Sequence, residues 1–409
     1  MKRLAELAEK TAPGKAGAGI INTASARLSK TAVEEFADAS FSAAVIAWQK
    51  QHGRHALPWQ NTRDAYRIWL SEIMLQQTQV SAVIPYYQRF LARFPDVASL
   101  ASAASEEVMA LWSGLGYYSR ARNLHRCAQR VVAEYAGRFP DDPELLADLP
   151  GIGRSTAAAI AAFAYGKRAA ILDGNVKRVF ARTFGVEGFP GAKPIEDHLW
   201  RRAVHLLPLQ NMESYTQGLM DLGATLCTRS KPACARCPLA ARCVAHATGR
   251  VDELPVRKPK KAVPERSTAM LVVADNDQIL LQQRPDSGIW GGLLSLPECV
   301  SGAEADNDSE EDLKRRDVEI ARVVAPFGVM QSCAPLQAFS HGFTHFKLQV
   351  APYQVILEKR VPNLGQHDYV WYPIGQLADA PLPAPVKKLL LAIFLRPDLF
   401  SDGVLTGGS

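Results

Sequence analysis

The stretch LPGIGRSTAAAIAAFAYGKRAAILDGNVK, residues 149–177, restricts the fold of this chain more than any other. Gly151 and Gly153 allow backbone angles that a side chain would penalise, so a tight turn can open directly into the helix-prone run from Ser155 to Phe163. Such a turn presents backbone N–H groups at a helix N-terminus, and these groups bind anionic oxygens such as those of a DNA phosphate. LPGIG alone fits an ordinary connection between two helices equally well.

A carboxylate follows this turn. The apolar run from Ala169 to Leu172 leads to Asp173, which precedes a further helical segment, and the commonest duty of an Asp there is to cap the helix. LPGIG, an Asp some twenty residues later and then Val-Lys-Arg-Val resemble the helix–hairpin–helix DNA glycosylases, which remove damaged or mispaired bases. The resemblance implies that Asp173 is the catalytic carboxylate and that Asn175 orients it or its water. It also implies DNA contacts at hairpin residues, namely Leu149, Gly151, Gly153 and Ser155.

Glu72 is a second candidate catalytic carboxyl. On a helix it shares a face with Ile68, Trp69 and Leu75, and a carboxyl on an apolar face has a raised pKa and can donate a proton. The residues alone favour a Glu at the margin of the apolar stripe that reaches solvent. SEIMLQQTQV, preceded by LPW, is similar to the adenine DNA glycosylases of the MutY type, which implies that Glu72 is the general acid.

The segment LWSGLGYYSRARNL, residues 111–124, combines glycines, adjacent tyrosines and arginines. This composition suits a loop and helix start at a phosphate backbone, with an aromatic side chain available to wedge between bases. A helix connection with surface arginines fits the same string nearly as well. The resemblance implies that Tyr117 inserts beside the damaged base and that Gln77, in the LQQTQ segment, also enters the base stack.

Four of the seven cysteines form a C-x6-C-x2-C-x5-C pattern at Cys227, Cys234, Cys237 and Cys243. Four thiolates within seventeen residues can close on one metal centre, and both tetrahedral zinc and a Cys-ligated cubane fit the spacing. The pattern, with MDLGATL before it, resembles the 4Fe-4S loop of the endonuclease III and MutY branches. The resemblance therefore implies a 4Fe-4S cluster, for which we expect a structural and DNA-positioning role, because cationic residues interleave with the cysteines.

A length of 409 residues predicts two or three folded units. We expect an all-α helix–hairpin–helix glycosylase domain with its Fe–S loop and an α+β Nudix-like C-terminal domain. AMLVVADNDQILLQQR reads as two strands around a turn, and Ala384 to Phe394 as a closing helix. The expected boundaries are a disordered extension over 1–40, the helical domain over 41–245, a linker over 246–267, the Nudix-like domain over 268–397 and a tail over 398–409.

The second unit contains GIWGGLLSLPE, which resembles the core of Nudix domains. A Nudix hydrolase would continue from Gly292 and Glu298 into Arg-Glu and Glu-Glu pairs that bind magnesium, whereas this chain continues as CVSGAEADNDSEED, so we predict no hydrolase. In MutY-type enzymes such a domain reads 8-oxoguanine with a Phe-Ser-His loop. The resemblance places Phe343, Thr344 and His345 in that loop, although strand residues with a satisfied core His are an alternative.

The formal net charge of +6 permits nucleic-acid binding without demanding it. No run of eighteen apolar residues predicts a membrane span, and the first residues lack the apolar core of a signal peptide. We therefore expect no membrane association and a cytoplasmic, nucleoid-associated protein that acts as a monomer.

Together these features predict a monofunctional glycosylase that acts on adenine opposite 8-oxoguanine or guanine in double-stranded DNA. Glu72 would protonate the flipped adenine at N7, and Asp173 would stabilise or trap the oxocarbenium ion. Endonuclease III-type relatives carry at the position of Ser155 a Lys that forms a Schiff base, and Lys177 could replace it only adventitiously. The alternatives are an endonuclease III-like pyrimidine-lesion glycosylase and lyase, a non-catalytic DNA-binding protein and a nucleotide pyrophosphohydrolase.

Overall fold

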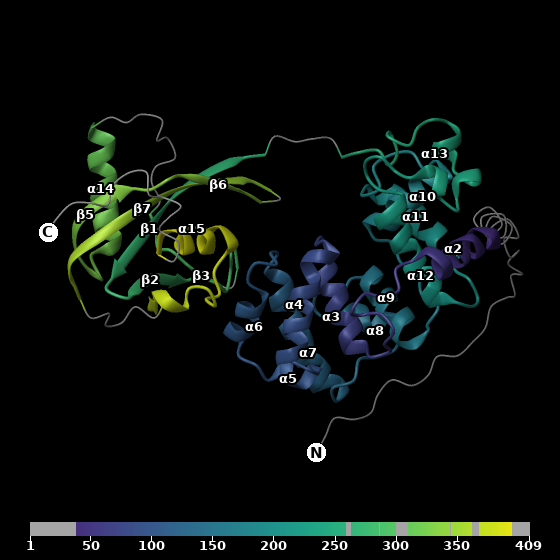
Figure 1. Cartoon of the computed structure of the whole chain (residues 1–409), viewed down its shortest axis with the longest axis horizontal. Helices are drawn as coiled ribbons and strands as arrows, with labels where there is room; N and C mark the ends of the chain where they lie inside the picture. Colours follow the sequence, from purple (N-terminus) through teal and green to yellow (C-terminus); the bar gives the residue numbers. More distant parts are fainter. Residues whose placement is uncertain are drawn as a thin grey trace, which may run out of the picture.

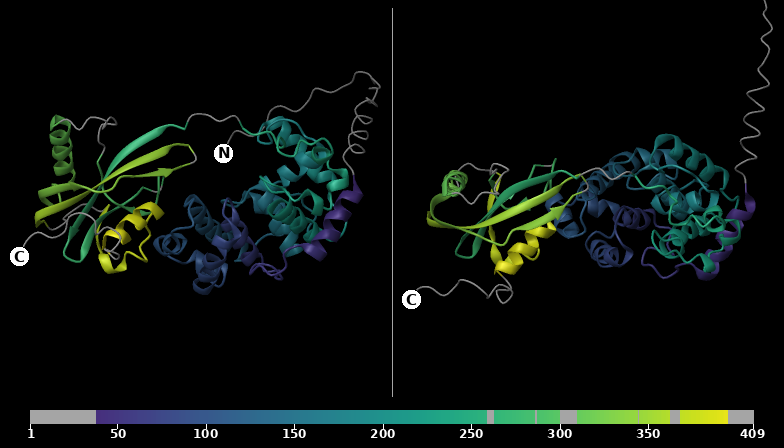
Figure 2. Two further views of the ribbon diagram at one scale, coloured as in Figure 1. Left: turned by 45° about the horizontal axis from the view of Figure 1, so that its top comes forward. Right: turned by 90° about the horizontal axis from the view of Figure 1, so that it is seen from above.

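The computed structural model describes residues 38–258, 263–285, 287–299, 310–343, 345–361 and 368–394. A helical unit and a sheet unit lie side by side in each view (Figures 1 and 2). Of the predicted N-terminal extension, only residues 38–40 are described, and they already belong to the helix Ala39–His52 and its cap. The predicted tail and Thr344 lie outside the described residues.

The first unit is all-α, as predicted. Its helices are α2 (Ala39–His52), α3 (Ala65–Leu75), α4 (Val80–Arg93), α5 (Val97–Ala101), α6 (Ser105–Trp112), α7 (Ser119–Tyr135), α8 (Pro143–Asp148), α9 (Arg154–Tyr165), α10 (Gly174–Phe184), α11 (Lys193–His205), α12 (Met212–Asp221) and α13 (Val244–Ala247). Short helical turns η1 (Leu222–Leu226), η2 (Cys234–Arg236) and η3 (Ala240–Arg242) carry the chain through the cysteine segment.

Helix α9 joins two hydrophobic cores. Its residues Ala157, Ile160 and Ala161 pack into a core around Trp69 and Trp112. Residues on its other side pack into a second core built from α2, α10 and α12, namely Ala158, Ala159 and Ala162. A helix that is apolar all round is buried, and the small alanines let neighbouring helices approach on both sides. The alanine-rich run after the Gly-rich turn therefore becomes the central helix of the unit.

The second unit is a mixed sheet with a helix on each face, which confirms the α+β prediction. Its main strand order is β3-β2-β1-β7-β5, with β1 and β7 parallel and the other pairs antiparallel. The elements are β1 (Glu265–Asp275), β2 (Gln278–Gln283), β3 (Leu294–Ser295), β4 (Glu298–Cys299), α14 (Glu310–Val324), β5 (Gly328–Pro335), β6 (Phe339–Gly342), β7 (Lys347–Arg360), β8 (Tyr369–Pro373), η4 (Ile374–Gln376) and α15 (Ala384–Phe394).

Successive side chains of β1 pack alternately against the helices on the two faces of the sheet. Leu271 and Val273 pack with Ile320 on α14, whereas Met270 and Val272 lie in the core that includes α15. Successive side chains of a strand point to opposite faces, so a continuous apolar run predicts a strand covered on both sides. Helix α15 has the predicted bounds, whereas α14 was not expected from the sequence.

The two units meet beside α15 (Figure 1). Ser113, directly after α6, donates its hydroxyl to the carbonyl oxygen of Leu382 at 2.8 Å, and Arg122 on α7 donates to the carbonyl oxygen of Gly291. Buried apolar residues form one continuous core from α6 to α15. The sheet unit is therefore fixed to the half of the helical unit that carries α3 and α7.

The described part of the predicted linker packs partly on the helical unit. Leu254 is buried, and its carbonyl oxygen accepts a hydrogen bond from Arg182 at 2.8 Å. Helix α13 also extends two residues beyond the expected end of the helical domain, and β1 begins three residues before the expected start of the second. None of the helices described is both long and apolar enough to cross a bilayer.

Candidate active site

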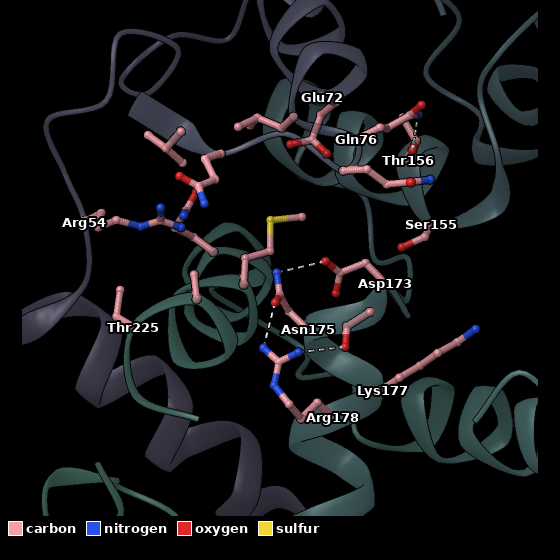
Figure 3. A pocket seen from close by; sticks show the side chains of 18 of the residues that line it. Arg54, Glu72, Gln76, Ser155, Thr156, Asp173, Asn175, Lys177, Arg178 and Thr225 are labelled. Carbon is pink, nitrogen blue, oxygen red and sulfur yellow. Dashed lines mark hydrogen bonds between the residues drawn. The ribbon is translucent and has the colours of Figure 1, made fainter. Parts of the chain in front are cut away.

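A large cavity lies in the helical unit and is lined by α3, the start of α9, the start of α10 and the loop before α3. Glu72 on α3 and Asp173 at the start of α10 face this cavity from opposite walls (Figure 3). Ser155, Asn175 and Lys177 also line it. The fold therefore brings together two carboxyl groups that are a hundred residues apart in the chain.

Glu72 has an environment that favours the protonated acid. Burial raises its pKa to about 8, and the nearby Asp173 carboxylate adds to the shift. Within the described part of the chain, no cation or hydrogen-bond donor pairs with the Glu72 carboxyl group. A carboxyl group of this kind retains its proton at neutral pH and can act as an acid. Glu72 is partly exposed and lies in the wall of the cavity.

Asp173 is held differently. One carboxylate oxygen accepts the backbone N–H of Val176 at 2.8 Å as the cap of α10, and the other accepts from Asn175 Nδ2 at 3.2 Å. Burial raises the pKa of Asp173, whereas these hydrogen bonds and the positive charge of Arg178 oppose the rise. Two neighbouring carboxyl groups with different surroundings can hold opposite protonation states. The capping role expected from the sequence is present in the same side chain.

Asn175 connects Asp173 to the cysteine segment. Its Oδ1 accepts from Arg178 Nη2 at 2.8 Å, and Arg178 also donates to the carbonyl oxygens of Gly223 and Cys227, both at 2.7 Å. A Cβ on Gly223 would lie 2.4 Å from Asn175 Cβ, so a glycine is required for this close approach. Sequence reasoning missed Arg178, although it stands in the quoted Val-Lys-Arg-Val run.

The Gly-rich turn ends at α9. Gly151 has a φ of +79°, and a Cβ there would meet Asn123 Cβ at 2.9 Å, so both conformation and space require glycine. Gly153 is the exposed N-cap residue of α9. The side chain of Leu149 is buried, so it packs beneath the turn. Ser155 Oγ accepts the backbone N–H of Leu172 at 3.0 Å and so fixes the segment that precedes Asp173.

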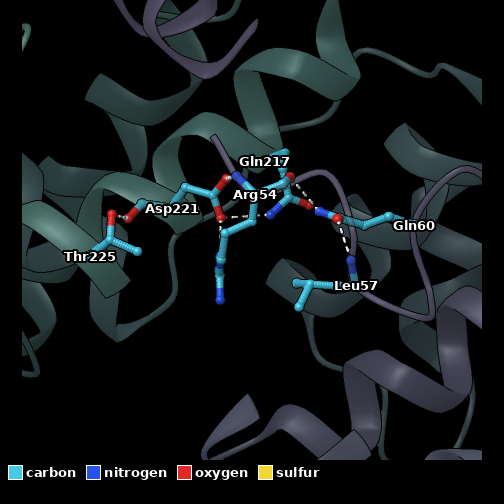
Figure 4. Close-up of polar contacts among 6 residues, drawn as sticks. All are labelled: Arg54, Leu57, Gln60, Gln217, Asp221 and Thr225. Atoms are coloured by element: carbon cyan, nitrogen blue, oxygen red, sulfur yellow. Dashed lines mark hydrogen bonds and ion pairs between the residues drawn. The ribbon is translucent and has the colours of Figure 1, made fainter. Parts of the chain in front are cut away.

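The loop before α3 is fixed to α12 by a buried carboxylate (Figure 4). Arg54 donates its backbone N–H and its Nε to Asp221, at 2.8 and 2.6 Å, and Gln217 donates to the same carboxylate at 2.8 Å. Gln60 accepts the N–H of Leu57 and donates to the Arg54 carbonyl oxygen. Asp221 was not a sequence candidate, because its partner Arg54 lies 167 residues away and no local pattern marks the pair.

Gln77 and Tyr117 lie at exposed positions on neighbouring loops. Gln77 lines the cavity and is exposed, and 49% of Tyr117 is exposed, whereas the adjacent Tyr118 is buried. Both Gln77 and Tyr117 have left-handed backbones, with φ values of 57° and 50°. Such angles are uncommon for residues with large side chains and mark sites held by their surroundings.

The four clustered cysteines line one small cavity with apolar walls. Cys227, Cys234, Cys237 and Cys243 all face it and carry no disulfide. Arg182 donates to Cys227 Sγ at 3.4 Å, and its backbone oxygen lies 3.4 Å from Cys243 Sγ. Among the described residues, no three His, Cys, Asp or Glu side chains are grouped so that they could ligate one ion.

The hairpin between β6 and β7 carries the residues predicted to read the opposite strand. The N–H of Phe343 donates to the carbonyl oxygen of Phe346 at 2.8 Å, which places His345 in the hairpin tip, where it is exposed. The rings of Phe343 and Phe346 stack at 4.6 Å, and Trp290 and His341 lie against Phe343. Trp290 and His341 stand in the GIWGGLLSLPE and HGFTHF strings, but their contact with Phe343 was not expected from the sequence.

Glu298, the acidic residue of the Nudix-like core from which a hydrolase would continue into its magnesium-binding pairs, has a basic partner. Glu298 forms an ion pair with Arg284 at 2.9 Å, and both side chains are largely shielded from solvent. Helix α14 then presents the fully buried Ile320 to the sheet. The carboxylate of Glu298 is therefore neutralised by a side chain of its own domain.

Comparisons with known proteins agree on two regions. A family model described as "HhH-GPD superfamily base excision DNA repair protein" matches residues 70–204, and one described as "NUDIX domain" matches residues 268–392. An adenine DNA glycosylase of Buchnera aphidicola subsp. Acyrthosiphon pisum is 35% identical over 355 residues, covering 86% of this chain and 96% of that protein. The adenine DNA glycosylase of Homo sapiens is 34% identical over 79% of this chain and 68% of its own. A solved thermostable thymine-DNA glycosylase is 29% identical, with a TM-score of 0.47, over 54% of this chain and 99% of that one.

Proposed function

The chain belongs to the adenine DNA glycosylase family, base excision repair enzymes that hydrolyse N-glycosyl bonds, and we propose that it releases adenine mispaired with 8-oxoguanine or guanine in double-stranded DNA. The observation that carries this proposal is the convergence of Glu72 and Asp173 on one cavity in different electrostatic surroundings. Similarity to adenine DNA glycosylases over most of the chain supports this function above an endonuclease III-like pyrimidine glycosylase.

The reaction begins when adenine leaves the base stack, which costs less for a mispaired base than for a paired one. Glu72 then transfers its proton to N7, so that the base departs as a neutral leaving group. The raised pKa of Glu72 supplies the protonated form at neutral pH. Gln77 and Tyr117 fill the space that the base leaves in the stack.

Cleavage of the glycosidic bond develops positive charge on the sugar. Asp173, ionised and oriented by Asn175, stabilises this oxocarbenium ion or traps it covalently, and water then attacks C1′. Ser155 offers a hydroxyl where a Schiff-base amine would be needed, so the enzyme is a monofunctional glycosylase. The N–H groups at the Gly151–Gly153 turn bind a phosphate beside the lesion, and buried Leu149 holds the turn in place.

The hairpin of the sheet unit reads the base opposite adenine. Exposed His345 and partly exposed Phe343 lie at the tip, and Thr344 between them supplies the hydroxyl of the family's Phe-Ser-His loop. The protein acts as a monomer on chromosomal DNA, which would place it at the nucleoid of the cytoplasm.

Cys227, Cys234, Cys237 and Cys243 would hold a 4Fe-4S cluster. The four thiols face one apolar cavity, which supports a Cys-ligated centre at this place, and the resemblance to the endonuclease III and MutY branches favours the cluster over zinc. With four protein ligands the cluster would serve structure and present the surrounding cationic loop to phosphates.

The test is single-turnover release of adenine from three duplexes, with adenine opposite 8-oxoguanine, guanine or thymine, in the wild type and in Glu72→Gln. We expect release from the first two duplexes only, and loss of that release in the variant. Binding of all three without cleavage would favour the non-catalytic alternative. Rapid strand cleavage without added base would instead contradict the monofunctional assignment.

A further inference from the structure

Arg120 is a buried arginine whose side-chain hydrogen bonds, among the described residues, all go to backbone and hydroxyl oxygens. Its Nη1 donates to the carbonyl oxygens of Ile73, Met74 and Gln76, at 3.0, 2.8 and 2.7 Å. These carbonyls lie at the C-terminal end of α3, the helix that carries Glu72. A cation at a helix C-terminus is favourable, because the last carbonyls are unpaired and carry partial negative charge.

The same guanidinium also holds the neighbouring loop. Its Nη2 donates to Thr78 Oγ1 and to the carbonyl oxygen of Gly116, both at 3.1 Å, and more weakly to Leu115 at 3.4 Å. Its carbon lies 5.5 Å from the centre of the Tyr117 ring. One side chain therefore joins the turn after α3 to the loop before α7.

The residues that Arg120 contacts flank Gln77 and immediately precede Tyr117. Gln77 and Tyr117 both have left-handed backbones, which are unfavourable for residues with large side chains and persist only where the surroundings hold them. Burial lowers the pKa of Arg120 to about 10, so the group remains charged at neutral pH. Within the described part of the chain no carboxylate pairs with it, and the carbonyl groups and Thr78 accept its hydrogen bonds. The rings of Trp112 and Tyr117 lie 5.3 and 5.5 Å from its guanidinium carbon, and its Nε has no hydrogen-bond partner among the described residues.

We propose that Arg120 is a positioning residue that presets Gln77 and Tyr117 for insertion into the base stack before DNA binds. The inference rests on the proposed function, because it assigns both side chains to the flipping of adenine. If Gln77 and Tyr117 are held rigidly before DNA binds, less conformational entropy is lost on binding. If they are misplaced, the reaction slows even though the reacting atoms are unchanged. Arg120 acts on the step that delivers adenine to Glu72.

The experiment compares Arg120→Met and Arg120→Lys with Arg138→Met, which removes one exposed arginine from the same unit. Single-turnover reactions on adenine opposite 8-oxoguanine give a rate constant and an amplitude, which reports the folded, active fraction. Fluorescence of 2-aminopurine at the target position reports flipping. We expect a rate constant lower on the order of 10²-fold in Arg120→Met, a weaker flipping signal, a smaller loss in Arg120→Lys and no change in the control.

Each outcome decides the proposal. A purely structural role would lower the amplitude of both Arg120 variants and leave the rate constant and the flipping signal of the active fraction intact, which would overturn it. A full rate constant in Arg120→Lys would overturn it as well, because one ammonium group cannot bridge both loops in the manner of a guanidinium. If Arg120→Met fails to fold, Arg120→Lys alone decides between these results. Absence of adenine release by the wild type would instead overturn the proposed function.

Discussion

Each of the two units of this protein contains a partly buried carboxyl group that stands in a family motif. The surroundings of the two groups differ. In the helical unit, Glu72 lies in a cavity wall and has no basic partner among the residues that the structure describes, and burial raises its pKa to about 8. In the sheet unit, Glu298 forms an ion pair with Arg284 at 2.9 Å. The two carboxyl groups therefore differ in whether a basic side chain of the same unit pairs with them, and the unpaired Glu72 is the one placed to donate a proton.

The largest effect is expected from Glu72→Gln. Glutamine keeps the size and the hydrogen-bonding reach of the side chain but has no proton to transfer. Single-turnover release should therefore fall by roughly 10²–10⁴-fold or more, which is the usual contribution of a general acid. The matched variant is Glu298→Gln, which should leave release unchanged. Near-normal release by Glu72→Gln would remove the contrast between the two units.

The substitution Asp173→Asn distinguishes the helix-capping role of Asp173 from the role of its negative charge. Asparagine caps helices about as well as aspartate, so the stability to urea should change by less than about 1 kcal/mol. The negative charge that faces the oxocarbenium ion is lost, so release should fall on the order of 10²-fold. Asp142 caps α8 by accepting the N–H of Glu144 at 2.7 Å, and Asp142→Asn is the control for the cap alone. Equal rates in both variants would make Asp173 a structural cap only.

The pH dependence of release tests the raised pKa of Glu72 directly. Glu72 must be protonated and Asp173 ionised, so above the pH at which Asp173 loses its proton the rate should be level up to about pH 8, the pKa of Glu72, and should then fall about tenfold per unit. DNA binding measured over the same range is the control for other titrating groups. A fall that began near the ordinary value of 4.5 would show a carboxyl group that is not buried.

The same shift predicts a change in stability. The folded pKa of Glu72 lies above its ordinary value of 4.5, so the folded state binds the proton more tightly. This stabilisation is complete below the ordinary pKa and is lost as the pH rises through about 8. Urea midpoints at about pH 6 and about pH 9 should therefore differ less in Glu72→Gln than in the wild type.

Local patterns were sufficient for several parts of the molecule. The turn and helix around Asp173, the β1–β2 hairpin and the bounds of α15 follow from capping, alternation and periodicity, which act over a few residues. Glu72 could be interpreted only through the resemblance, because its own spacing favoured a solvent-facing position. The cavity that Glu72 lines could not be predicted from the local sequence.

The contacts that were not predicted join distant segments. Asp221 and Arg54 are 167 residues apart, and Arg120 reaches carbonyl groups more than 40 residues away. Backbone carbonyls have no sequence signature, so an arginine that binds them looks like a surface arginine until the fold is known. Helix α14 was not predicted for a different reason, since its acidic first residues continue the polar stretch that stands in place of the magnesium motif.

The smallest expected effect concerns Lys177. Its amine could react with the abasic sugar, but it is held in an ion pair. Its Nζ forms an ion pair with Glu196 at 2.6 Å, and Figure 3 shows the side chain directed away from Asp173. Glu196→Gln should free the amine and modestly increase the covalent adduct that borohydride traps from the abasic product, whereas Lys177→Met should abolish any increase. Unchanged trapping in Glu196→Gln would mean that distance restrains Lys177, and the parallel with Arg284 and Glu298 would then fail.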